Sequence, residues 1–106
     1  MKAYWINATE QTVSEVEYTG IADLQRMVGG YIEVAVQWPS GDVLFVDEEG
    51  LLKGPSVGFR IPERTDQPLA GNGVLVGREI GDTANTEPPK MPLEQLRVRV
   101  MFLRFR

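Results

Sequence analysis

The densest group of side chains that could do chemistry is an acidic run in the middle of the chain. Asp47, Glu48 and Glu49 are consecutive, and Asp42 precedes them by five residues. Neighbouring carboxylates can act as general acid and base, or can bind a hard cation through oxygen. The spacing does not fit the twelve-residue calcium loop, in which acids alternate before a glycine. We therefore interpret the run as an exposed, solvated turn. A hydrolase that uses these carboxylates with a divalent cation is the third function that we weigh.

Arginines form the second group. Arg60 and Arg64 lie in a stretch rich in glycine and proline, and Arg97 and Arg99 belong to the last ten residues, which hold four arginines and no acid. Guanidinium groups bind phosphates and carboxylates, so a small anionic ligand such as a nucleotide is the second hypothesis. Nucleic acid is disfavoured as a partner because the net charge is −4, whereas nucleic-acid binders usually carry a basic surplus. The residues that we single out for binding a ligand or partner are Arg60, Arg64, Arg97, Arg99, Asp47, Glu48 and Glu49.

Much of the usual catalytic repertoire is absent from the composition. The chain has no cysteine and no histidine, which excludes disulfides, thiolate nucleophiles and zinc sites built from these residues. Its serines therefore have no histidine partner for nucleophilic catalysis. The glycines of residues 71–77 precede a predicted strand rather than a helix, so they indicate a turn and not a phosphate-binding loop. We predict no catalytic residue, no bound metal and no cofactor.

Length and composition indicate one globular domain over residues 1–106, with 42% apolar and 25% charged residues. No apolar run approaches the roughly 20 residues of a membrane helix, and a polar residue at Asn7 interrupts the N-terminus too early for a signal peptide. We therefore expect a cytoplasmic protein with no membrane contact. Residues 1–50 carry nine acids and two bases (−7), whereas residues 51–106 carry six acids and nine bases (+3). This polarity either steers a partner or is neutralised across the fold.

The first half of the chain alternates between strand and helix patterns. Residues 3–6 and 12–18 predict an opening hairpin, because short apolar and alternating runs flank a polar turn. Residues 21–28 have apolar side chains at helical spacing and are followed by two glycines, which predicts a short helix with a glycine C-cap. Residues 31–38 alternate strictly, and residues 43–46 are apolar on both faces. These two runs predict a second hairpin whose later strand is central in the sheet.

The second half is less regular. Short strands are predicted at residues 57–61 and 74–76. Residues 81–92 have no apolar period, which predicts an exposed, mobile loop. A helical turn opened by Pro92 follows, and residues 97–106 favour a strand over a helix, with either a bulge near Met101 or burial on both faces. The whole pattern predicts an α+β domain: a mostly antiparallel sheet of five or six strands, one short helix and a C-terminal helical turn.

Three stretches together carry a family resemblance: MKAYWIN at residues 1–7, GDVLFVDEEGLLK at 41–53 and PLAGNGVLVG at 68–77. In this order and spacing the chain resembles a family of small bacterial and phage domains with no assigned function, over about three-quarters of its length. The resemblance implies an association with phages, plasmids and other mobile elements, and it transfers no functional residue. Our leading hypothesis is therefore a non-enzymatic accessory protein that binds a host or phage macromolecule.

Overall fold

Five antiparallel strands form the central layer of the computed structural model, which describes residues 1–81 and 85–105. The strands are β1 (Lys2–Asn7), β2 (Thr12–Glu17), β3 (Ile32–Gln37), β4 (Val43–Asp47) and β7 (Gly73–Val76), in the order β2-β1-β7-β4-β3. Both predicted hairpins are confirmed, since β1 pairs with β2 and β3 pairs with β4. The doubly apolar strand β4 lies between β7 and β3, which agrees with its predicted central position.

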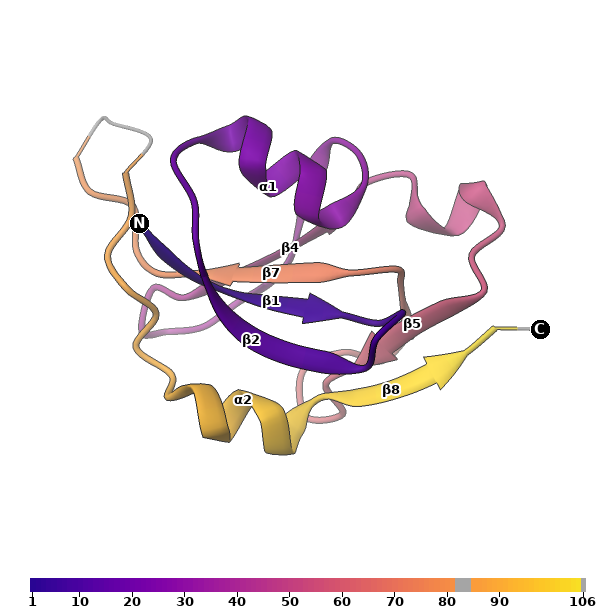
Figure 1. Cartoon of the computed structure of the whole chain (residues 1–106). Helices are drawn as coiled ribbons and strands as arrows, with labels where there is room; N and C mark the ends of the chain where they lie inside the picture. The colour runs from indigo at the N-terminus through magenta and orange to yellow at the C-terminus, as the bar shows by residue number, and fades with distance from the viewer. Residues whose placement is uncertain (82–84, 106) are drawn as a thin grey trace.

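The helix α1 (Ile21–Val28) covers one face of this sheet (Figure 1). Its buried residues Leu24 and Val28 pack with Val74 and Val76 of β7. The indole nitrogen of Trp5 in β1 also donates a hydrogen bond of 3.0 Å to the carbonyl oxygen of Met27, near the end of the helix. These contacts hold α1 against β7 and tie its end to β1. The helix ends as predicted, at a glycine (Gly29) whose φ of 89° lies in the left-handed region.

The opposite face is covered by a second sheet and a second helix (Figure 1). The second sheet is antiparallel and has the strand order β6-β5-β8, with β5 at Val57–Arg60, β6 at Leu69–Ala70 and β8 at Met101–Arg104. The sequence predicted one sheet, and this sheet is additional to it. The helix α2 (Leu93–Arg99) precedes β8, and a 3-10 helix, η1 (Gly50–Lys53), links β4 to β5. The larger core lies between the layers and includes Leu44, Phe59, Leu75 and Leu96. The described residues therefore form one α+β domain.

The predicted strand over residues 97–106 is wrong for its first part. Helix α2 continues to Arg99, and the chain turns to an extended conformation at Val100, so that β8 begins at Met101. The helix is favoured because Leu96 is fully buried and Arg97 pairs with Glu94 one turn earlier. This packing outweighs the strand preference of the valines in this segment.

The prediction of an exposed loop at residues 81–92 is wrong for the end of that segment, and residues 82–84 lie outside the described residues. Met91 is buried, because two side chains hold its backbone. The carboxylate of Asp42 accepts the N–H groups of Lys90 and Met91 at 2.8 and 2.9 Å, and the hydroxyl of Tyr4 donates to the carbonyl of Met91 at 2.8 Å. In the described part of the chain, neither helix is long and apolar enough to cross a membrane.

Candidate functional site

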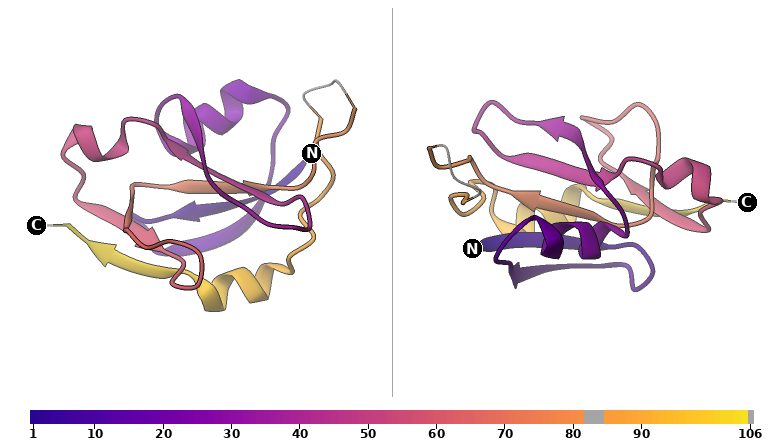
Figure 2. Two further views of the ribbon diagram at one scale, coloured as in Figure 1. Left: turned by 180° about the vertical axis from the view of Figure 1, so that it is seen from behind. Right: turned by 90° about the horizontal axis from the view of Figure 1, so that it is seen from above.

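Helix α1 leaves much of β3 and β4 uncovered on its face of the sheet, as the view from above shows (Figure 2, right). A groove of about 350 Å³ runs between the helix and these strands. Its apolar lining comes from α1, β3, β4 and β7: Ile21, Leu24, Ile32, Val34, Val43, Phe45 and Val76. Ile21 and Val34 are 57% and 48% exposed. Large apolar side chains at the mouth of a groove are typical of a surface that a partner covers.

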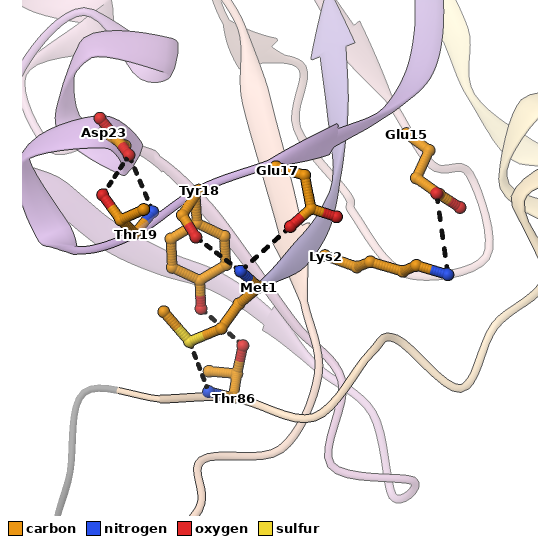
Figure 3. Close-up of polar contacts among 8 residues, drawn as sticks. All are labelled: Met1, Lys2, Glu15, Glu17, Tyr18, Thr19, Asp23 and Thr86. Atoms are coloured by element: carbon orange, nitrogen blue, oxygen red, sulfur yellow. Dashed lines mark hydrogen bonds and ion pairs between the residues drawn. The ribbon is translucent and has the colours of Figure 1, made fainter.

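One end of this groove is polar and held by hydrogen bonds (Figure 3). The hydroxyls of Tyr18 and Thr86, which both line the groove, are hydrogen-bonded to each other. The amino group of Met1 donates to the carbonyl of Tyr18 at 2.7 Å, and the Met1 sulfur accepts the N–H of Thr86 at 3.2 Å. These contacts link both ends of the first hairpin to the segment after β7 and so fix this end of the groove.

The two edges of the five-stranded sheet differ in how they are protected. At the β2 edge, α2 lies against the strand, and the Nε of Arg97 donates to the carbonyl of Val13 at 2.9 Å. At the β3 edge, no strand pairs with the outer side among the described residues. An edge strand leaves the N–H and C=O groups of alternate residues unpaired. The strand contains no proline or lysine, and a shift of register between Val34 and Val36 interrupts its pairing with β4. The edge of β3 is therefore open to a further strand.

A second hollow, of about 330 Å³, lies beside β3 and includes Glu33, Glu48, Leu51 and Leu52 in its lining. The two leucines of η1 are 65% and 85% exposed. Eight large apolar side chains are exposed in the described part of the chain, and five of them belong to α1, η1, β3 or the residue before β3: Ile21, Tyr31, Val34, Leu51 and Leu52. Four of these five side chains line one of the two hollows, Ile21 and Val34 the groove and Leu51 and Leu52 the second hollow.

The acidic run does not form a metal centre among the described residues, which contain no group of three or more acidic, histidine or cysteine side chains that could hold an ion. The carboxylate of Asp47 binds the amine of Lys53 at 2.6 Å and accepts the N–H of Glu49 at 2.9 Å. Glu48 and Glu49 are exposed, as predicted for a solvated turn. Asp42 lies at the other end of β4, buried, and so does not join the run.

The four candidate arginines have separate environments. Arg97 pairs with Glu94, and Arg99 pairs with Glu63 at 3.1 Å. The guanidinium of Arg64 lies 5.5 Å from the centre of the Trp38 ring. The Nε of Arg60 is buried and has no hydrogen-bond partner in the described structure. Two of the four positive charges are therefore already paired within the protein.

Sequence reasoning missed the residues of the groove and the edge. It used Ile21 and Val34 only as members of the apolar periodicity of their elements, and that periodicity does not tell whether a neighbouring element covers the apolar face. One signal was available. Residues 31–38 alternate with polar side chains, unlike the doubly apolar β4, and this contrast is typical of a strand nearer the edge.

Together, the fold and the groove define a small α+β domain with one closed and one open sheet edge. A family model described as a domain of unknown function, DUF3846, matches residues 1–97, and the chain belongs to that family. The predicted membership of a family with no assigned function is confirmed. No curated protein and no solved structure matches the chain.

Proposed function

We propose that this protein is a non-enzymatic binding protein whose β3 edge and adjoining groove take an extended segment of a protein partner. The observation that carries the proposal is the contrast between the two edges of the central sheet. Arg97 and α2 cover the β2 edge, whereas exposed apolar side chains border the β3 edge. Addition of a peptide strand to an exposed sheet edge, with side-chain pockets beside it, is a recurrent way to bind proteins.

The dimensions of the groove suit side chains of a peptide. Its volume of about 350 Å³ lies at the small end of the range for ligand sites. Covering apolar surface of the groove with a few side chains favours binding, and the part of this gain that exceeds the freedom lost on binding appears as affinity. The main chain of the partner would add hydrogen bonds along β3.

The family resemblance supports a biological setting for this activity. We place the protein among the cytoplasmic accessory proteins of phages and other mobile elements, with a host or phage protein as the partner. The other two hypotheses have less support. The hypothesis of an anionic nucleotide has less support because two of the candidate arginines, Arg97 and Arg99, are already paired with carboxylates. For a carboxylate-based hydrolase, Asp47 is held by Lys53.

Selection from a random peptide library displayed on phage tests the proposal, followed by calorimetric titration of the best peptide. Val34→Lys places a charge in the groove and is expected to weaken binding at least about tenfold, equivalent to about 1.4 kcal/mol. Val98→Lys is the matched control, because Val98 is 83% exposed on α2, in the layer opposite α1. The proposal would be contradicted if both variants weakened binding equally, or if the selection yielded no binding peptide.

A further inference from the structure

The geometry points to a particular kind of partner: a segment that joins the central sheet as a sixth strand beside β3 and alternates apolar with basic side chains. This inference rests on the proposed function and gives the partner its chemistry. Three features of the β3 edge support it: hollows on both sides of the strand, acidic side chains in the lining of one of them, and unpaired main-chain groups.

The two hollows differ in character. Ile32 and Val34 of β3 line the groove under α1, where the lining of the sheet is apolar except for Gln37. Glu33, which lies between them in the strand, lines the second hollow together with Glu48. Successive side chains of a strand point to opposite faces of a sheet. An added strand would therefore send every second side chain toward the apolar groove and the intervening ones toward the acidic hollow.

The charge around the edge favours lysine or arginine at the intervening positions. Glu33, Asp47 and Glu48 line the second hollow, and no lysine or arginine of the described part of the chain does. Lys53 neutralises Asp47, whereas no ion pair involves Glu33 or Glu48 among the described residues. Among the described residues, Glu79 is the one charged residue that lines the groove under α1. Cationic side chains at an acidic rim speed association and select against acidic partners.

The same charges select against a second copy that pairs β3 with β3. Such a pairing would bring Glu33 and Glu48 of both copies to one edge, and like charges facing each other across a strand pair are destabilising. A basic segment from a different polypeptide has no such repulsion. We therefore assign the edge to a basic, alternating segment of another protein.

Main-chain pairing distinguishes strand addition from simple insertion of side chains. A strand added beside β3 uses the N–H groups of alternate residues in hydrogen bonds to β3, and the N–H groups between them point away. N-methylation of the partner should therefore abolish binding at every second position and be tolerated at the positions between. A peptide that binds only through side chains has no reason to show this period of two.

The probe is a synthetic nine-residue peptide, capped at both ends, in which valine and isoleucine alternate with lysine and arginine. Its control has the same composition with all apolar residues in one block. Fluorescence anisotropy of labelled peptides against the full chain should show the alternating peptide binding at least about tenfold more tightly than the block peptide. N-methylated versions should lose binding with a period of two. The double variant Glu33→Gln, Glu48→Gln should weaken binding several-fold and flatten its dependence on salt.

The outcomes separate the inference from the proposed function. If library-selected peptides require Val34 but tolerate N-methylation at every position, the binding groove stands and the sixth strand is overturned. Equal binding of the alternating and block peptides also overturns the sixth strand. If the alternating peptide binds Val34→Lys as well as the unchanged protein, the groove itself is wrong. If sedimentation shows that the protein is a dimer and that Val34→Lys makes it a monomer, the β3 edge binds a second copy of the chain. The inference of a basic partner would then be overturned.

Discussion

The Nε of Arg97 donates a hydrogen bond of 2.9 Å to the carbonyl oxygen of Val13, 84 positions earlier in the chain. This contact uses a backbone acceptor of β2 and fixes α2 beside that edge of the central sheet. An unpaired strand edge is a template for pairing with other chains, so proteins commonly cover it. The domain covers one edge in this way and leaves the β3 edge open, and that difference is the basis of the proposed binding site.

Replacing Arg97 should destabilise the domain more than replacing its neighbour in the same helix. Arg97→Ala removes a charged donor from the carbonyl of Val13 and is expected to lower the free energy of unfolding by about 1 kcal/mol. Arg99→Ala removes a partly exposed ion pair with Glu63 and should cost about 0.5 kcal/mol or less. Urea unfolding of both variants measures the difference. Equal losses would show that the Arg97 contact has no special role.

The buried carboxylate of Asp42 should be important for stability. Asp42→Ala leaves the N–H groups of Lys90 and Met91 without their acceptor, with an expected loss of about 3 kcal/mol. Tyr4→Phe removes the single hydrogen bond to the carbonyl of Met91 and should cost about 1 kcal/mol. The exposed Asp66 supplies the control, since Asp66→Ala should change stability by less than about 0.5 kcal/mol. Chemical denaturation followed by tryptophan fluorescence checks all three. A small effect of Asp42→Ala would contradict this role.

Asp23 should give α1 a dependence on acid pH. The backbone N–H of Thr19, followed by the Arg26 guanidinium and the Thr19 hydroxyl, lowers the pKa of this carboxyl from 3.8 to about 2. Because the pKa is lower in the folded state, the stabilisation is fully present above pH 3.8 and is lost as the pH falls through about 2.

Titration of the Asp23 carboxyl by NMR measures this pKa directly. In unfolding experiments over the same range, Asp23→Asn should lose less stability on acidification than the unchanged protein. A pKa near 3.8 in the folded protein would contradict the role that we give to Thr19.

Divalent cations should leave the stability of the protein unchanged. The carboxylate of Asp47 is already bound by Lys53 and by the N–H of Glu49. We expect the same melting temperature with magnesium, with calcium and with EDTA, because a ligand that binds the folded state would raise it. Differential scanning calorimetry makes the comparison. If either metal raises the melting temperature and Asp47→Asn abolishes this rise, the hydrolase hypothesis is supported again.

Local patterns predicted the elements whose periodicity agrees with their packing. Residues 21–28 formed the helix over those bounds, since apolar spacing, dipole charges and a glycine C-cap all favoured it. At residues 97–99, local preference and packing disagreed. Two β-branched residues near Arg99 favoured a strand, but Val98 is 83% exposed and Leu96 is fully buried, so packing through Leu96 determined the helix.

The candidate site could not be predicted in the same way, because it depends on contacts between distant segments. The edge of β3 is open because β3 is the last strand in the sheet order. That order depends on β7, a strand from late in the chain that lies between β1 and β4. The groove depends on where α1 rests, which Trp5 and Val74 help to determine. By contrast, the solvated character of Glu48 and Glu49 is a local property, and the sequence was sufficient to predict it.

Amide hydrogen exchange of the full chain, with and without the best selected peptide, tests the central claim most directly. The peptide should slow exchange of the outward-facing N–H groups of β3 (Ile32–Gln37) and leave those of β2 (Thr12–Glu17) unchanged, because only a paired edge gains hydrogen bonds. Protection confined to α2 and β8, or binding with no change in β3, would contradict the assignment of this edge as the binding site.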